Sequence, residues 1–254
     1  ETMTNKLKYF IGNWKMFGDF KSLKIIEKIH FFLKKHKNYQ KKNIFVMCIP
    51  STLISIFSIK FKSKLINYGA QNCFHKPHHG PYTGSVSASM LKSSGAKYII
   101  LGHSENRNEG ETNSIIKKKI ELSLKEKLIV ILCIGESLKQ KNKKKTVIAL
   151  RKQIGDSIDK KYNFKKLIIA YEPVWSIGTG KIPKTQELVK IFKFIKKEFK
   201  LKFKKNPPNV LYGGSVNQDN IKMFSSIREI DGFLIGGASQ SPKKFIDIIK
   251  NYYK

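Results

Sequence analysis

The sequence has little cysteine and no long apolar run. Its three cysteines, Cys48, Cys73 and Cys133, are an odd number and form no paired framework, which is typical of a protein kept reduced, so we expect a cytoplasmic protein. No uninterrupted apolar run approaches the roughly 18 residues that a membrane-spanning helix needs. The N-terminal residues show no signal-peptide-like apolar segment. We therefore expect no membrane partner.

Acidic residues and arginine are also scarce. The 254 residues include 50 Lys and Arg against 18 Asp and Glu, a net charge of +32, yet only Arg107, Arg151 and Arg228 are arginines. Nucleic-acid readers favour arginine for bidentate contacts, and here lysines are spread over almost every predicted helix without interleaved aromatic residues. We expect no nucleic-acid partner, and a basic nucleic-acid-binding protein on the same scaffold stays as an alternative. The positive field would steer a phosphorylated substrate inward.

What the chain does have is a regular alternation of short apolar runs and longer amphipathic segments. Nearly all-apolar runs are typical of parallel strands covered on both faces. The runs are Tyr9–Asn13, Ile44–Ile49, Leu65–Ala70, Tyr98–Gly102, Leu128–Ile134, Leu167–Tyr171, Asn209–Tyr212 and Gly232–Ile235. The amphipathic segments include Lys21–Lys35, Ser114–Lys127, Val147–Lys160, Thr185–Phe203 and Pro242–Tyr253.

Eight strand–helix units in a chain of this length predict an α/β fold, a (β/α)8 barrel formed as a single domain by residues 1–254. An open, doubly wound sheet is the alternative. Thr112 and Thr185 are expected to be helix N-caps. The longest segment without periodicity, Gln71–Ser89, is expected to be functional or to contact a partner.

Residues able to do chemistry follow several predicted strands. Each has an ordinary explanation by itself: a carboxylate caps helices, a histidine packs in a loop, and paired glycines make turns. They are Asn13 and Lys15 after the first strand, His103, Ser104 and Glu105 after the fourth, Glu172 after the sixth, Gly213, Gly214 and Ser215 after the seventh, and Gly236 and Gly237 after the eighth. Because the carboxyl ends of barrel strands meet at one end, the set predicts proton transfer on a small phosphorylated substrate.

Metal and nucleotide chemistry find little support in the sequence. His75, His78 and His79 have only Cys73 near them at ligand spacing, and no nucleotide-binding fingerprint is present. We expect neither a metal nor a cofactor.

Six motifs, in order along the chain, resemble the triosephosphate isomerase family. They are Gly12–Met16, Leu101–Glu105, Cys133–Glu136, Ala170–Lys181, Tyr212–Val216 and Asp231–Ser239. The resemblance implies interconversion of dihydroxyacetone phosphate and D-glyceraldehyde 3-phosphate through an enediolate, in glycolysis and gluconeogenesis. Another phosphate-binding barrel enzyme is the alternative.

By this resemblance Glu172 is the base, His103 a neutral imidazole that polarises the carbonyl, and Lys15 the cation that stabilises the oxyanion. The expected substrate-binding residues are Asn13, Lys15, Gly178, Ser215, Gly236 and Gly237. Ser104, Glu105 and Cys133 are expected to support them. The resemblance also implies a lid that excludes water. The lid residues are Pro173, Val174, Trp175, Ser176, Ile177, Gly178, Thr179, Gly180, Lys181, Ile182 and Pro183.

The family resemblance further implies a homodimer, in which a loop threonine, here Thr83, packs beside the active site of the second subunit. The family usually has glutamate where this chain has Ser85 and arginine where it has Asn106, and these two pair across the interface. Both charges are missing together, which leaves neither unpaired. We therefore expect a dimer with a rebuilt interface. Glu111 is the candidate for a structural glutamate of the family, in a segment one residue shorter than usual.

Overall fold

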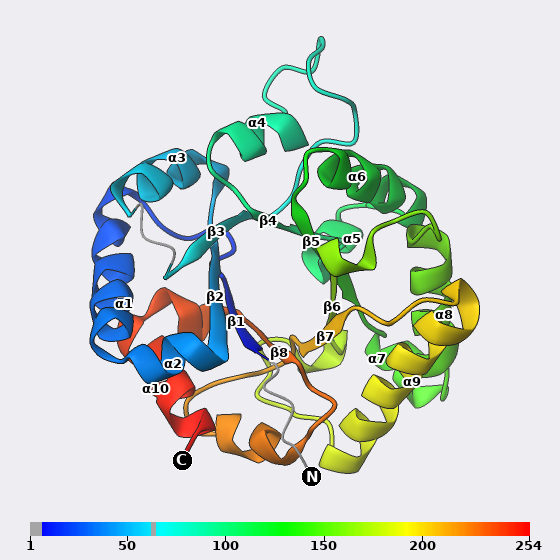
Figure 1. Cartoon of the computed structure of the whole chain (residues 1–254). Coiled ribbons are helices and arrows are strands. Elements are labelled where there is room, and N and C mark those ends of the chain that lie inside the picture. The colour runs from blue at the N-terminus through cyan, green and yellow to red at the C-terminus, as the bar shows by residue number, and fades with distance from the viewer. Residues whose placement is uncertain (1–6, 62–64) are drawn as a thin grey trace.

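Every apolar run predicted to be a strand contains one. The eight strands are parallel and close into a barrel in chain order (Figure 1). The structure is a computed structural model that describes residues 7–61 and 65–254, so parts of the expected single domain, 1–6 and 62–64, lie outside the described residues. The strands are β1 (Lys8–Asn13), β2 (Asn43–Cys48), β3 (Asn67–Ala70), β4 (Tyr98–Leu101), β5 (Ile129–Ile134), β6 (Leu167–Tyr171), β7 (Asn209–Tyr212) and β8 (Gly232–Ile235).

The barrel closes where β8 pairs with β1, and this pairing rules out the open, doubly wound sheet. Gly232 makes the close approach possible. A Cβ at this position would lie 2.2 Å from the carbonyl oxygen of Tyr9, and the φ angle of +154° is one that residues with side chains rarely adopt. A glycine is therefore required at the start of β8.

Strands are apolar throughout because each one separates two cores. In β6 all five residues are buried. Ile168 and Ala170 belong to the cluster inside the barrel, whereas Leu167 and Ile169 pack outward in the larger cluster shared with the helices. This alternation explains why the sequence shows continuous apolar runs rather than a polar and an apolar face.

Helices form a ring around the strands, as Figure 1 shows. Predicted apolar faces turn inward: Phe192, Ile195 and Phe199 are fully buried. The helices are α1 (Leu23–Lys35), α2 (Lys37–Lys42), α3 (Ser51–Lys60), α4 (Ala88–Ser93), α5 (Ser104–Asn108), α6 (Asn113–Lys125), α7 (Leu138–Asn142), α8 (Thr146–Ser157), α9 (Thr185–Phe203) and α10 (Pro242–Tyr252), with 3-10 turns η1 (Phe20–Ser22), η2 (Phe164–Lys166), η3 (Val174–Ser176), η4 (Ile221–Ser226) and η5 (Gly237–Gln240). No helix in the described part is long and apolar enough to cross a membrane.

One predicted N-cap is confirmed and one is wrong. The Thr112 hydroxyl accepts the backbone N–H of Ile115 at 3.3 Å and caps α6. Thr185 is instead the first residue of α9, and Lys184 occupies the N-cap position. The reason is Glu187, whose carboxylate accepts the Lys184 N–H at 3.3 Å and so moves the helix start one residue earlier.

The long irregular segment after β3 projects away from the barrel beside α4 (Figure 1). Its base is closed by a hydrogen bond from the Phe74 N–H to the Val86 carbonyl, 2.8 Å long. Between these residues the chain is exposed from Lys76 to Gly84, including Thr83. Such a loop buries little of itself, which favours a partner that covers it.

Candidate active site

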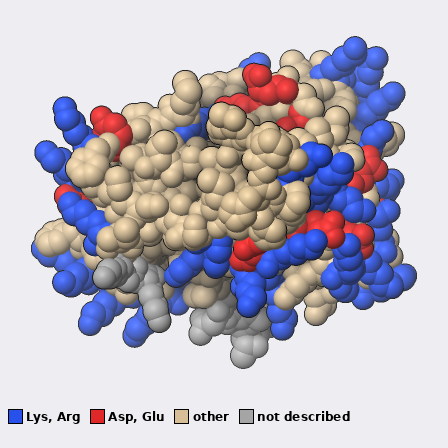
Figure 2. Space-filling view, turned by 90° about the horizontal axis from the view of Figure 1, so that it is seen from above, with Lys and Arg blue, Asp and Glu red and all other residues tan. Residues whose placement is uncertain are grey.

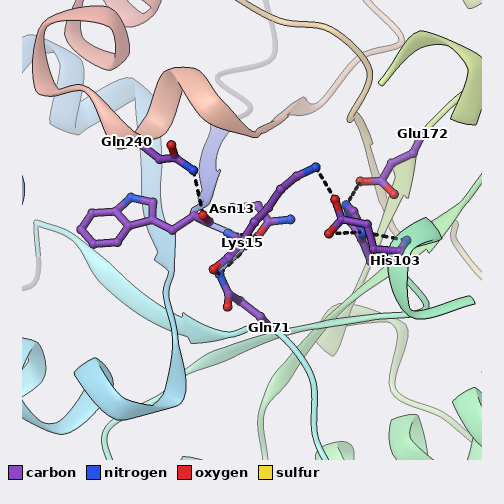
Figure 3. A network of polar contacts seen from close by, with 8 residues as sticks. Asn13, Lys15, Gln71, His103, Glu172 and Gln240 are labelled. Atoms are coloured by element: carbon purple, nitrogen blue, oxygen red, sulfur yellow. Dashed lines mark hydrogen bonds and ion pairs between the residues drawn. The ribbon is translucent and has the colours of Figure 1, made fainter. Parts of the chain in front are cut away.

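The turn after β1 carries the first two polar groups of the site. Asn13 ends the strand, and its side-chain oxygen accepts the backbone N–H of Lys15 at 3.0 Å. Lys15 has a left-handed backbone with φ of +57°, which lifts its side chain into the mouth of the barrel. Figure 3 shows how Gln71 and Gln240 hold this turn: their amide nitrogens donate to the carbonyls of Lys15 and of Trp14, each at 2.9 Å.

Sequence reasoning did not identify Gln71 or Gln240 as part of the site. Gln71 directly follows β3, and Gln240 ends the short turn after β8, so the rule used for the other strand ends could have found both.

Lys15 reaches across the barrel to the loop after β4. Its ammonium nitrogen lies 2.6 Å from Oε1 of Glu105, an ion pair with the carboxylate half exposed (Figure 3). Ser104, the other expected supporting residue of this segment, is buried at the start of α5. The contact joins the first and fourth strand ends, which are 90 residues apart in the chain.

His103 and Glu172 face each other inside the site. Nε2 of the histidine lies 3.3 Å from Oε1 of the carboxylate, and the two residues are only 4% and 3% exposed. On the other side of the ring, Nδ1 accepts the backbone N–H of Glu105 at 3.3 Å. A nitrogen that accepts a hydrogen bond carries no proton, so this contact assigns the ring proton to Nε2, which points at Glu172.

Two opposing effects set the pKa of His103. Burial is the largest effect and lowers it, but the charge and hydrogen bond of Glu172, together with the charge of Glu105, offset burial, so the pKa lies above its usual value. The raising effect depends on the charge of the carboxylate. Once Glu172 accepts a proton, burial is left as the main effect and favours the neutral ring.

The backbone of Glu172 is fixed by the neighbouring strand. Its N–H donates to the carbonyl of Ile134 at 2.8 Å, which extends the pairing of β5 with β6 by one residue. Gly135 permits this contact, because a Cβ there would lie 1.7 Å from the carbonyl oxygen of Glu172. Among the described residues, Oε2 of Glu172 is buried without a hydrogen-bond partner, so one carboxylate oxygen is free to take a proton.

Cys133 lies below this pair in the barrel interior. It is 1% exposed, and burial together with the charge of Glu172 raises the pKa of its thiol well above the usual range. The thiol therefore stays protonated, and its backbone carbonyl accepts a hydrogen bond from Nη2 of Arg107 at 3.2 Å. A buried, protonated thiol at this position packs beneath the site and is not a nucleophile.

A cavity of about 340 Å3 joins all the expected substrate-binding residues. Glu172 and His103 line it together with the glycine-rich segments after β7 and β8. The expected binding residues that line it are Asn13, Lys15, Gly178, Ser215, Gly236 and Gly237. Lys244 also lines the cavity and was missed, because on a lysine-rich helix nothing in the sequence distinguishes it.

The histidines considered for metal binding lie elsewhere. His75, His78 and His79 are in the projecting loop, and His78 faces Glu126 at 3.4 Å. Within residues 7–61 and 65–254, no group of His, Cys, Asp and Glu side chains could hold a metal ion.

The segment predicted to be the lid, residues 173–183, is held near its start by two hydrogen bonds. The indole N–H of Trp175 donates to Oε1 of Glu136 at 2.9 Å, and the hydroxyl of Tyr171 donates to the same carboxylate at 3.1 Å. Burial raises the pKa of Glu136, while these two donors partly offset it. Glu136 belongs to one of the sequence motifs, but only the fold shows that it contacts the lid.

Glu111 has a structural place near the base of the projecting loop. Oε1 of its carboxylate accepts the side-chain amide of Asn72 at 2.8 Å and pairs with the ammonium of Lys119, which is 5% exposed. Lys119 in turn donates to Oδ1 of Asn72 at 2.9 Å. The three side chains join α6 to the segment after β3, as expected of a structural glutamate.

A base and an acid buried at the carboxyl ends of barrel strands are the groups that such folds use for catalysis. The fold and the site together define a (β/α)8-barrel enzyme equipped for proton transfer.

Comparison with known proteins identifies the family. The profile described as triosephosphate isomerase matches residues 8–252. Triosephosphate isomerase of Dictyoglomus thermophilum is 38% identical over 250 residues, covering 96% of this chain and 99% of that protein. The enzyme of Buchnera aphidicola subsp. Cinara cedri is 42% identical over 250 residues, covering 94% and 96%. The crystal structure of triosephosphate isomerase from Bartonella henselae has a TM-score of 0.88 at 32% identity, covering 97% and 99%.

The chain belongs to the triosephosphate isomerase family. It is an isomerase that interconverts dihydroxyacetone phosphate and D-glyceraldehyde 3-phosphate, a step of glycolysis.

Proposed function

We propose that Glu172 removes the proton from the carbon next to the substrate carbonyl and returns it to the neighbouring carbon. The observation that carries this proposal is the buried pair of Glu172 and His103 at one end of the cavity, 3.3 Å apart, with Oε2 of the carboxylate unpartnered among the described residues. A desolvated carboxylate beside a substrate carbon is well placed for such a transfer, because water does not compete for it.

His103 acts on the oxygens of the substrate. Its proton is on Nε2, the nitrogen that faces the cavity, because Nδ1 is occupied by the N–H of Glu105. The ring donates this proton to the carbonyl oxygen and later passes a proton between the two oxygens. When Glu172 has taken up the carbon proton, the charge that raises the pKa of His103 is gone, so a neutral ring is favoured at the enediolate stage.

Lys15 and Asn13 complete the oxyanion side of the site. The Lys15 ammonium carries the positive charge that a developing enediolate requires, and Glu105, 2.6 Å away, positions it. Substrate oxygens would compete with Glu105 for this charge, since the carboxylate is half exposed. Asn13 lines the same cavity as an uncharged partner.

The opposite end of the cavity holds the phosphate. Backbone N–H groups at Gly236 and Gly237 can approach an anion closely, because the segment after β8 is rich in glycine, and Ser215 lines the same cavity with its N–H 3.4 Å from the hydroxyl of Ser176. Gly178 adds a further N–H from the lid when the lid closes over the substrate. Closure excludes water and protects the enediolate from losing phosphate.

The functional unit we propose is a homodimer formed around the projecting loop. A hollow of about 480 Å3 lies beside Lys15, and its wall includes Met16, which is fully exposed, and Phe74. The loop tip of a second copy, at Thr83, would fill this hollow and cover Met16. Figure 2 looks onto the face from which the loop projects, and the middle of this face has few charged side chains although lysines surround it.

The setting that we propose is the cytoplasm, where glycolysis runs and where thiols stay reduced. Cys48, Cys73 and Cys133 are all buried and free.

Replacing the base tests the mechanism. Glu172→Gln keeps the shape of the side chain but cannot accept the carbon proton. We expect kcat to fall by at least about 1,000-fold, since general-base contributions of 100- to 10,000-fold are typical. A coupled assay with glyceraldehyde 3-phosphate measures this, with Glu229→Gln on the surface as the matched control. Equal rates for Glu172→Gln and the wild type would overturn the proposed roles.

A further inference from the structure

Ser176 occupies a junction between the lid and the phosphate end of the cavity. It is the last residue of η3 in the first part of the lid, and it is fully buried. Its hydroxyl lies close to three groups from different segments: the carbonyl of Lys181 at 2.5 Å, the hydroxyl of Tyr212 at 3.3 Å and the backbone N–H of Ser215 at 3.4 Å.

The hydrogen-bonding capacity of one hydroxyl matches these neighbours. A serine hydroxyl has one proton to donate and two lone pairs. Lys181 offers only a carbonyl oxygen here, so the proton of Ser176 goes there. The lone pairs then accept from Tyr212 and from the Ser215 N–H. Burial raises the pKa of Tyr212 to about 12, so its hydroxyl keeps its proton and donates.

These contacts connect parts of the chain that must move or bind together. Lys181 is near the far end of the lid, so its bond to Ser176 ties the two ends of the lid to each other. Ser215 lines the phosphate end of the cavity.

We propose that Ser176 is a positioning residue that couples the lid to the phosphate-binding segment after β7. It does not contact the reacting carbons. Its hydrogen bonds fix the two ends of the lid relative to each other and relative to the backbone amide of Ser215. Binding of the phosphate group at this segment therefore favours the closed lid. The proposal rests on the phosphate site described under the proposed function.

The test compares two substrates that differ only in the phosphate. Ser176→Ala removes the hydroxyl, and kcat/KM is measured for glyceraldehyde 3-phosphate and for glyceraldehyde, the latter through deuterium uptake from heavy water. We expect a loss of about ten- to hundredfold for the phosphorylated substrate, the range for an unpaired buried hydrogen-bonding group. Glyceraldehyde turnover should be unchanged, because this substrate has no phosphate through which the lid is closed.

Ser225→Ala is the matched control, because its hydroxyl donates to a carbonyl of its own turn on the surface, and it should change neither rate. Equal losses for both substrates with Ser176→Ala, or no loss, would overturn the proposal. Glu172→Gln abolishes turnover of both substrates, so failure of the catalytic roles is distinguishable from failure of the coupling.

A second variant keeps the test decisive if Ser176→Ala does not fold. Tyr212→Phe removes one partner of the hydroxyl and should give a smaller loss, again confined to the phosphorylated substrate. Where Ser176→Ala does fold, the double variant should lose less activity than the product of the two single losses, because both substitutions break the same contact. Fully independent losses would contradict coupling through Ser176.

Discussion

The charge of Glu172 governs the protonation of the ring beside it. His103 is buried, and burial alone would favour the neutral imidazole. In the substrate-free site the negative charge of Glu172 raises the pKa of the ring. This effect ends when the carboxylate takes up a proton. The same contact thus raises the pKa of the ring before proton abstraction and no longer raises it afterwards, without any movement of the ring.

This argument predicts how the pKa of His103 responds to loss of the charge. Glu172→Gln removes the negative charge that raises the pKa of His103 most, whereas burial, which lowers it, remains. The pKa of His103 should therefore fall below its wild-type value. Nitrogen chemical shifts of the His103 ring, followed by NMR over a pH titration, measure it. A pKa that is unchanged or higher in the variant would contradict the arrangement of charges described for the site.

The same shift has a consequence for stability, with a definite sign. Because the folded protein binds the ring proton more tightly than the unfolded chain does, this contribution is fully present below the ordinary histidine pKa, about 6.5. It is lost as the pH rises through the folded-state pKa. The unfolding free energy of the wild type relative to Glu172→Gln should therefore decrease over this window, as chemical denaturation at several pH values would show.

At the scale of elements, the lid differs in how its two ends are held. The first end is bonded to the barrel through Trp175, whose indole N–H donates to the buried carboxylate of Glu136 at 2.9 Å. The other end is Pro183, which is buried directly before the start of α9. Proline fixes the φ angle and removes an N–H.

Pro183 is therefore expected to alter the rate at which the lid opens while leaving the chemistry unchanged. In Pro183→Ala, the dependence of kcat on solvent viscosity should change, whereas the kinetic isotope effect on proton abstraction should not. Unfolding should become easier by about 0.4–1 kcal/mol, because alanine gives the unfolded chain more freedom. Identical turnover and substrate binding in the variant would rule out a role for this residue in lid motion.

On the scale of the whole molecule, charge is unevenly spread. The net charge is +32, yet residues 77–91, which form the projecting loop and the start of α4, contain no Asp, Glu, Lys or Arg. Two copies of a strongly charged protein repel each other, and a face that lacks like charges lowers this repulsion where the copies meet. Ser85 and Asn106, where the family usually has a glutamate and an arginine, fit such a face.

We predict a dimer that is weaker than an interface with a buried ion pair and that tightens with salt. Added salt screens the repulsion between two copies of charge +32, so the dissociation constant should fall as salt increases. Sedimentation velocity over a dilution series at two salt concentrations measures it. A monomer at micromolar concentration with full activity would contradict the proposed functional unit.

The large positive charge also allows a test of the alternative that the protein binds nucleic acid. Lysines spread over the surface should give only weak, salt-sensitive attachment, which is lost at physiological ionic strength. A gel-shift titration with duplex DNA and single-stranded RNA, at low and at physiological salt, distinguishes the two cases. Binding that persists at physiological salt would revive the alternative.

The sequence by itself determined the barrel and the candidates for its chemistry. Strands buried on both faces must be continuously apolar, so all eight could be located, and the residues just beyond them had to meet at one end. The family motifs supplied the roles proposed for Glu172, His103 and Lys15. Several element ends differ by one to three residues from the predicted ones, and the N-cap of α9 is Lys184 instead of Thr185, because the side chain of Glu187 sets it.

Tertiary structure decided what depends on segments meeting in space. Gln71 and Gln240 follow strand ends, but only the fold shows that their amides hold the Lys15 turn. Likewise, only the fold shows that Glu136 contacts Trp175 and that Ser176 links three segments. The protonated nitrogen of His103 was likewise fixed only by the amide that contacts the other side of the ring. The physical reason is that hydrogen bonds are short and directional, so they are specified by the folded backbone and not by the order of residues.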